Sequence, residues 1–147
     1  MRGIGIRILI VAVIAVGGFL FRDRLSGSAG DLKVGDCFDA SQATEVKDIQ
    51  HHPCTESHTA EVVLVTTHPS VKGAPYPSDG DVQTYGDNTC APAVISYVGA
   101  QANLDNLNYG IFYPKEKDWQ DGERGIICYA LNLDLSPLTH SFKAASN

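Results

Sequence analysis

The hydrophobic pattern begins with an uncharged apolar run, Ile8 to Phe21, composed of Ile, Leu, Val, Ala, Gly and Phe. A helix from Gly3 to Phe21 would span roughly 28 Å at about 1.5 Å per residue, close to a hydrocarbon core about 30 Å thick. Arg7 is compatible with such a helix because its long stem can lie in the apolar layer while its guanidinium reaches the headgroups. The pattern predicts a cytoplasmic stub and transmembrane anchor at residues 1–24, followed by a flexible Gly, Ser and Ala tether at residues 25–31.

A cleaved signal peptide is the alternative interpretation of this run. Arg2 and Arg7 resemble the basic start of a signal peptide, and the small residues Gly27 to Ala29 offer a cleavage site. However, the charged residues Arg22 to Arg24 follow the apolar run directly and separate it from that site. This order favours an uncleaved anchor over a cleaved signal near Ala29, and both over a buried core helix.

Beyond the tether, the pattern predicts one small α+β domain at residues 32–136, mainly an antiparallel sheet with one central helix. The expected strands share apolar alternation or β-branched residues, and they are Leu32 to Phe38, Thr44 to Ile49, Ala60 to Thr66, Tyr109 to Tyr113 and Ile126 to Leu133. Four consecutive aliphatic residues, Val62 to Val65, indicate a central strand covered on both faces. Pro53 should end the second strand, and Asp121-Gly122 is typical of a hairpin turn that pairs the last two strands.

The central helix should open at Ser78, where Asp81 is a partial capping-box partner, and end at Gly99. Its apolar residues fall near one face: Val82, Tyr85, Cys90, Ala93, Val94, Tyr97 and Val98. Pro92 removes a helical hydrogen bond, so we expect a kink, or a break with a fresh turn near residues 88–91. After Pro137 the periodicity is lost, which predicts a loosely held tail at residues 137–147.

The cysteines decide the orientation of the anchor. All four follow the apolar run, at Cys37, Cys54, Cys90 and Cys128. An even number in a region this small is typical of two disulfides outside the cell, because cytosolic glutathione would keep the thiols reduced. Basic residues flank both ends of the run, so the positive-inside rule does not choose an orientation. We therefore expect a single-pass cell-membrane protein with a cytoplasmic amino terminus and an extracytoplasmic domain.

Charge excludes one class of partner. From Asp23 onward the chain carries 17 acidic and 8 basic residues. Such a domain repels phosphate backbones and anionic lipid heads, so we expect no nucleic-acid binding and membrane contact only through the amino-terminal helix.

Three clusters carry residues that could do chemistry. The first, His51, His52, Cys54, Glu56 and His58, has the residue types of a zinc or copper site. However, an oxidised Cys54 is not a thiolate ligand, and adjacent histidines on a strand point to opposite faces, so we expect no metal site and no cofactor. A cysteine nucleophile with His58 as its base is disfavoured because no cysteine is left unpaired.

The other two clusters surround the Asp121-Gly122 turn. Its acids, Asp118, Asp121 and Glu123, could supply a glycosidase pair, but acids beside a turn glycine are usually only solvated. Trp119 either plugs the core, which we favour, or stacks on sugar rings of the wall. Arg124 should pair with an acid such as Asp118 rather than bind a ligand. We expect no catalytic residues, and we keep His58, Trp119 and Arg124 as possible binding residues.

Several short motifs along the chain form a combined pattern: Val34-Gly35-Asp36-Cys37-Phe38, Cys54 with Ser57 to Val62, Tyr76-Pro77, Cys90, Tyr113-Pro114, Trp119 with Asp121 to Arg124, and Cys128. This pattern resembles the septum formation domain family of actinobacterial envelope proteins. Family members commonly have Trp-x-x-Gly-Asp-Arg before the last Cys, and this chain has Glu123 in place of that Asp. The resemblance implies an exterior domain linked to division septa, and it carries over no catalytic residues.

The spacing of the cysteines suggests the pairs Cys37–Cys54 and Cys90–Cys128, although four cysteines allow three connectivities and the sequence does not choose between them. We expect a non-enzymatic, membrane-anchored binding or scaffold module of the cell envelope, with other envelope or septal proteins as partners. The alternative is an envelope hydrolase or wall-glycan receptor that uses the His51 to His58 loop or the Trp119 turn.

Overall fold

The computed structural model describes residues 26–27, 31–40, 49–99 and 102–144. The predicted anchor lies outside these residues, as do most of the predicted tether and residues 44–48 of the predicted second strand. Within the described part, no helix has the length and apolar character needed to cross a bilayer.

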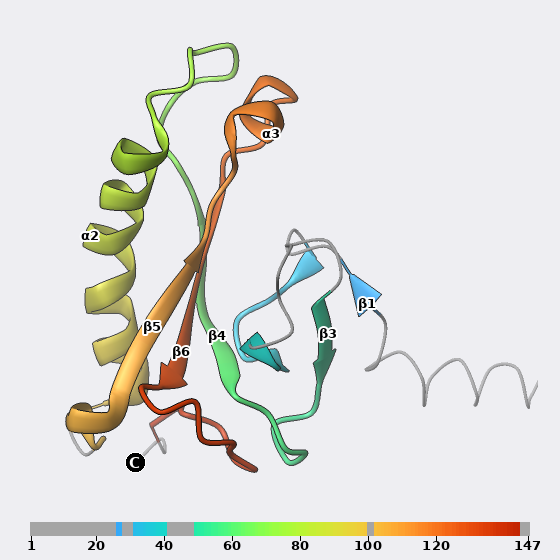
Figure 1. Cartoon of the computed structure of the whole chain (residues 1–147), viewed down its shortest axis with the longest axis vertical. Coiled ribbons are helices and arrows are strands. Elements are labelled where there is room, and N and C mark those ends of the chain that lie inside the picture. Colours follow the sequence, from blue (N-terminus) through green and yellow to red (C-terminus); the bar gives the residue numbers. More distant parts are fainter. Residues whose placement is uncertain (1–25, 28–30, 41–48, 100–101, 145–147) are drawn as a thin grey trace, which may run out of the picture.

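An antiparallel sheet organises the described residues (Figure 1). Its strands are β1 (Ser26–Gly27), β2 (Cys37–Phe38), β3 (Ile49–His52), β4 (Ala60–Thr67), β5 (Leu107–Phe112) and β6 (Gly125–Asn132), in the spatial order β1-β3-β2-β4-β6-β5. Every pairing is antiparallel, and β4 lies inside the sheet between β2 and β6. The expected fold, an antiparallel sheet with one main helix and two disulfides, is confirmed for this part of the chain.

Strand β4 is covered on both faces along its first half, as its aliphatic run predicts. The register with β6 shifts between Val62 and Leu64, so Val63 is an extra residue in a β-bulge. Val62 packs in a cluster with Phe38 and Leu131, whereas Val63 packs in the cluster under the helix. Ordinary strand alternation points Val62 and Val63 to opposite clusters, and the bulge after Val62 lets both Val63 and Leu64 pack against the cluster under the helix.

Helix α2 (Asp79–Val98) packs against β4, β5 and β6. Ser78 caps it by accepting a hydrogen bond from the backbone N–H of Asp81, as predicted. Its buried residues recur at every fourth position: Val82, Gly86, Cys90, Val94 and Val98. Gly86 was not in the predicted apolar face; an added Cβ there would lie 3.0 Å from Ile111 Cγ2, so its small size allows close approach to β5. Of the two alternatives expected at Pro92, the break is wrong, because α2 continues through it as one helix, and the kink stays a prediction.

The connection between β5 and β6 is longer than the predicted hairpin turn. The two strands pair as expected, but helix α3 (Glu116–Gln120) lies between them. Asp121 caps the end of α3, and Gly122 follows with a φ of 101°, the left-handed region that favours glycine. The Asp-Gly signal therefore marks a helix end. A 3₁₀ turn, η4 (Leu104–Asn106), precedes β5.

The described part of the predicted tail is fastened rather than loose. Leu138 and His58 exchange two backbone hydrogen bonds, of 3.0 and 2.7 Å. Phe142 packs against the cluster under the helix, and the Ala144 N–H donates to the Tyr97 carbonyl. These contacts tie residues 138–144 to both the sheet and α2.

The Tyr129 side chain covers Gly110, the residue opposite it in the pairing of β5 with β6. This close packing predicts that a larger residue at position 110 destabilises the fold. A Cβ at Gly110 would lie 2.1 Å from Tyr129 Cζ, and the Tyr129 ring is held by Phe38 and Phe112, at centroid distances of 5.2 and 4.8 Å. Gly110→Ala should therefore lower the free energy of unfolding by about 1–3 kcal/mol, measured by denaturant titration.

In a Tyr129→Ala background, the same Gly110→Ala change should be neutral or slightly stabilising, since the clash is gone and a strand glycine is replaced. Gly125→Ala is the matched control because nothing lies within 4 Å of a Cβ there. Equal effects of Gly110→Ala in both backgrounds would contradict this account of the packing.

Candidate functional site

Trp119 lies in α3 and is a core residue, with 2% of its surface exposed. Its Nε1–H donates a 2.8 Å hydrogen bond to the carbonyl of Ala74, in the loop before α2. His68 and Tyr76 meet the indole in edge contacts, at centroid distances of 5.1 and 5.6 Å. The predicted core role of Trp119 fits this burial, and stacking of this indole on a sugar does not.

Arg124 covers one face of the Trp119 indole, with its Cζ 3.7 Å from the ring centroid. Its Nη1 donates hydrogen bonds of 2.7 Å to the carbonyls of both Trp119 and Glu123, and Nη2 donates to the carbonyl of Val71 at 3.4 Å. The expected pairing with Asp118 is therefore replaced by backbone carbonyls. Arg124 and Trp119 together fix the loop at residues 68–77 against α3.

Two local details follow from this arrangement. Burial, and then the nearby Arg124 charge, hold the pKa of His68 below its usual value. Glu123 contributes its backbone, because its N–H donates to Asp118 O and its carbonyl accepts from Arg124, while the residue is exposed. Because these contacts use backbone atoms, they do not depend on whether this position holds Asp or Glu.

Trp119, Arg124 and the loop at residues 68–77 form a unit that we call the Trp119 frame. Beside it lies a polar and aromatic edge formed by Tyr76, Asp79, Tyr113 and Lys115, in which Asp79 and Lys115 are exposed and the two tyrosines are partly buried against the core. The Lys115 ammonium donates to Asp79 at 3.1 Å and to the Tyr113 hydroxyl at 2.9 Å, and the Tyr76 hydroxyl donates to Asp79. Hydrogen bonds from Tyr76 and Lys115 lower the pKa of Asp79, and the bond with Tyr113 is the main cause of a raised Lys115 pKa. The edge thus brings together the two Tyr-Pro pairs, 76–77 and 113–114, at one end of the sheet.

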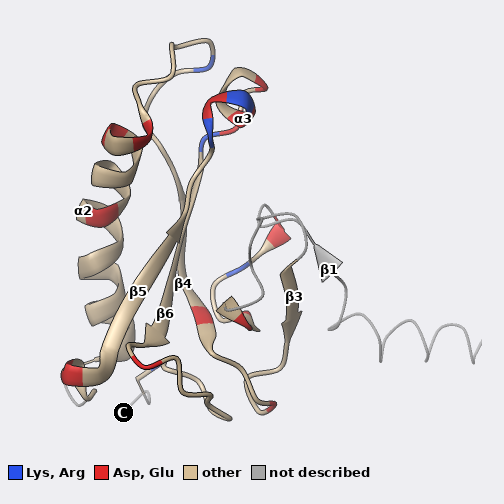
Figure 2. Cartoon of the chain, in the orientation of Figure 1, with Lys and Arg blue, Asp and Glu red and all other residues tan. Residues whose placement is uncertain are grey.

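Charges of both signs surround this edge. Figure 2 shows basic and acidic positions of α3 next to the acidic start of α2. The side chains of Lys115 and Asp79 are 57% and 60% exposed, so their ion pair contributes little to stability and is accessible to a partner.

Both disulfides have the suggested pairing, Cys37–Cys54 and Cys90–Cys128. The first joins β2 to the turn after β3, and the second joins α2 to β6. A disulfide sulfur carries no thiolate, so neither pair supplies a nucleophile in this form.

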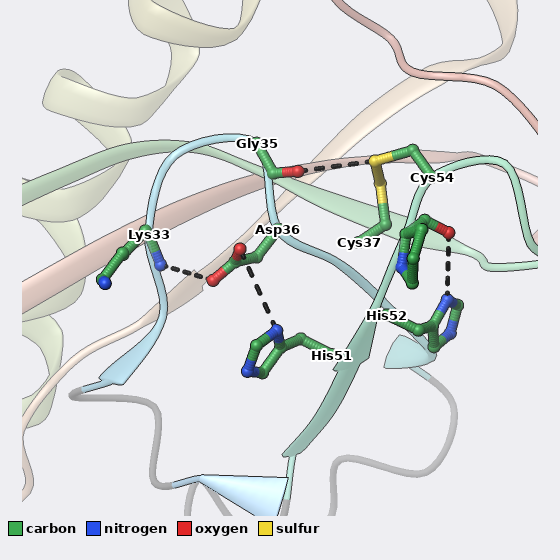
Figure 3. Close-up of polar contacts among 8 residues, drawn as sticks. Lys33, Gly35, Asp36, Cys37, His51, His52 and Cys54 are labelled. Carbon is green, nitrogen blue, oxygen red and sulfur yellow. Dashed lines mark hydrogen bonds and ion pairs between the residues drawn. A yellow bond between two sulfur atoms is a disulfide. The ribbon is translucent and has the colours of Figure 1, made fainter. Parts of the chain in front are cut away.

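The structure divides the predicted histidine cluster. His51 and His52 point to different sides of β3 (Figure 3). His51 Nδ1 lies 4.0 Å from Asp36 Oδ1, whereas His52 Nδ1 lies 3.4 Å from the Pro53 carbonyl. Of the described residues in this region, Cys37, Cys54 and His58 are the set whose potential ligand atoms all lie within 4.8 Å of one another. The cluster predicted from the sequence is therefore replaced by a smaller one that includes Cys37.

Glu61 is a buried charged residue that the sequence analysis did not single out. It is 1% exposed and accepts three hydrogen bonds: from the Tyr97 hydroxyl at 2.6 Å, the Ser141 hydroxyl at 2.7 Å and the Phe142 N–H at 2.6 Å. Burial, followed by the hydrogen bond to Glu61, raises the pKa of Tyr97. The sequence signal that could have identified Glu61 is a carboxylate at the start of an apolar run. Its contacts join β4, α2 and the carboxyl-terminal segment.

The hydrogen bond from Trp119 to Ala74 predicts the effect of a conservative substitution at Trp119 on the stability of the loop at 68–77. Trp119→Phe removes the donor to Ala74 O, so amide hydrogen exchange across residues 68–77 should quicken and the free energy of unfolding should fall by about 1–2 kcal/mol. Gln120→Ala, at an exposed neighbouring position, is the control and should leave both unchanged. If amide hydrogen exchange across residues 68–77 is unchanged in the Trp119→Phe variant, Trp119 does not hold this loop.

Comparison with known protein families identifies the family of this chain. A family model described as Septum formation matches residues 34–143. No curated protein and no solved structure matches the chain. The matched range includes both disulfides, the Trp119 frame and the polar and aromatic edge. The chain belongs to the septum formation family.

Proposed function

We propose that this protein is a membrane-anchored, extracytoplasmic and non-enzymatic binding module of the cell envelope that acts where septa form. The apolar run at residues 8–21 is the anchor, and the domain that follows is the part that meets a partner. Family membership supports the link with septum formation.

The observation that carries the proposal is the pairing of all four cysteines in a domain of this family. Stable disulfides are typical of proteins outside the cytoplasm, where glutathione does not reduce them. A domain outside the cell behind an amino-terminal apolar run places the amino terminus inside, which is the orientation we propose for the anchor.

The role as a binding module rests on the use of the motif residues. Trp119 and Arg124 are buried and hold the loop at 68–77, so their hydrogen bonds stabilise the fold rather than contact a ligand. What they support at the surface is the edge of Tyr76, Asp79, Tyr113 and Lys115. Tyrosine is enriched in protein interfaces, because its ring buries apolar area and its hydroxyl forms hydrogen bonds. We therefore propose that this edge contacts another envelope or septal protein.

The proposal predicts the behaviour of a charge reversal on the edge. Lys115→Glu places a second carboxylate beside Asp79 and should lower the yield of crosslinked partner several-fold, measured in intact cells with the full-length chain. A fluorescent fusion of the parent should collect at division septa. Lys33→Glu reverses an exposed charge near Asp36, away from the edge, and should behave like the parent.

Three results would count against parts of this account. A fusion spread evenly around dividing cells would contradict the septal role. Equal crosslinking by Lys115→Glu and the parent would show that the edge is not the contact surface. Retention of the parent on purified wall glycan, without a crosslinked protein, would favour the alternative of a wall-glycan receptor.

A further inference from the structure

His58 is a fully buried histidine whose position is fixed from several sides. It lies just before β4, is 0% exposed, and its backbone N–H and carbonyl both bond to Leu138. Nδ1 lies 2.8 Å from the carbonyl oxygen of Glu56. Since a carbonyl only accepts, Nδ1 is the nitrogen that carries the proton in this contact.

The other ring nitrogen is therefore an acceptor in the neutral ring. Nε2 is buried and has no hydrogen-bond partner among the residues that the structure describes. Metal-binding histidines typically have this tautomer, with Nδ1–H held by a backbone carbonyl and the lone pair of Nε2 free to bind the metal.

The Cys37–Cys54 disulfide lies beside this ring. A ring nitrogen of His58 and the Sγ atoms of Cys37 and Cys54 all lie within 4.8 Å of one another. In the oxidised form the sulfurs are bonded to each other and are not thiolate ligands. The sequence argument against a metal site therefore applies to the disulfide form and leaves the dithiol form to be considered.

The two disulfides differ in how far a reductant can reach them. Cys90 and Cys128 are both fully buried, as is Cys37, whereas Cys54 is partly exposed. Figure 3 shows the Cys54 sulfur next to the Gly35 carbonyl, at 3.4 Å. Since exchange needs access to a sulfur, Cys54 Sγ is the atom that an external thiolate reaches first.

We propose that reduction of Cys37–Cys54 by a dithiol converts this cluster into a Cu(I) site, with Cys37 Sγ, Cys54 Sγ and His58 Nε2 as ligands. Two soft thiolates and one imidazole in a buried site suit Cu(I), whereas a structural Zn²⁺ site requires a fourth ligand. This site is independent of the edge that we propose for partner binding.

The reaction balances with the dithiol as the only reductant. Its thiolate attacks Cys54 Sγ, the S–S bond breaks, and Cys37 leaves as a thiolate that takes up a proton. The second thiol of the reductant resolves the mixed disulfide, so the products are two cysteine thiols and an oxidised, cyclic dithiol. Binding of Cu(I) then releases the two thiol protons.

The test uses the full-length chain in detergent micelles. The chain is reduced mildly with dithiothreitol, desalted without oxygen, and titrated with Cu(I) in competition with the chromophoric chelator bicinchoninate. The reduced chain should take up one Cu(I), the disulfide form should take up none, and peptide mapping should show Cys90–Cys128 still bonded.

Variants at two histidines separate a ligand from a neighbour. His58→Asn keeps a side-chain N–H near the Glu56 carbonyl but removes the Nε2 acceptor, and it should weaken Cu(I) binding about tenfold or more. His52→Asn is the control, because its ring centroid lies 6.2 Å from that of His58 and it is not in the ligand set. It should bind Cu(I) like the parent.

X-ray absorption of the copper-loaded parent tests the ligand set without any substitution. It should show two sulfur neighbours and one nitrogen neighbour. The proposal is overturned if the disulfide form binds equally well, if His58→Asn binds like the parent, if the reduced chain takes up Zn²⁺ but no Cu(I), or if the copper has no nitrogen neighbour.

Discussion

The attachment of α2 to the sheet by the Cys90–Cys128 disulfide is the constraint on which the rest of this domain depends. The bond joins a fully buried position of the helix to a fully buried position of β6, across 38 residues of sequence. In the chain-entropy model a loop of this length is worth about 3–5 kcal/mol. That is a large share of the roughly 5–15 kcal/mol by which native domains are stable. With α2 attached to the sheet, residues at both of its ends contact other segments of the domain.

The two ends of α2 organise different parts of the surface. At its start, Asp79 accepts hydrogen bonds from Tyr76 and Lys115, and Lys115 also bonds to Tyr113. This edge lies beside Trp119 and Arg124. Near its end, Tyr97 donates to Glu61, which also holds the carboxyl-terminal segment. The same segment bonds to His58, which lies beside the Cys37–Cys54 disulfide. The helix therefore supports the surface that we propose for partner binding at its start and is linked, through the carboxyl-terminal segment, to the proposed Cu(I) site near its end.

The local sequence pattern was enough to predict β4, β6 and α2. Their signals are long apolar runs or repeats, a serine cap and a helix-ending glycine, all of which lie among neighbouring residues. It was not enough for α3, which has five residues, too few for a period, and whose Asp-Gly end resembles a hairpin turn. The partners of Glu61 lie 36 to 81 residues away, and Arg124 bonds to carbonyls rather than to a charge. No local pattern reports such contacts, so the frame around the candidate site required the structure.

Differential alkylation of the full-length protein in living cells tests the central claim most directly. Free thiols are first blocked in intact cells, the protein is then isolated without reduction, and its peptides are mapped. The account predicts that Cys90 and Cys128 are recovered as one linked peptide pair, because in the proposed orientation the domain folds outside the cytoplasm around that bond. Recovery of both cysteines as alkylated free thiols in the folded protein would contradict it.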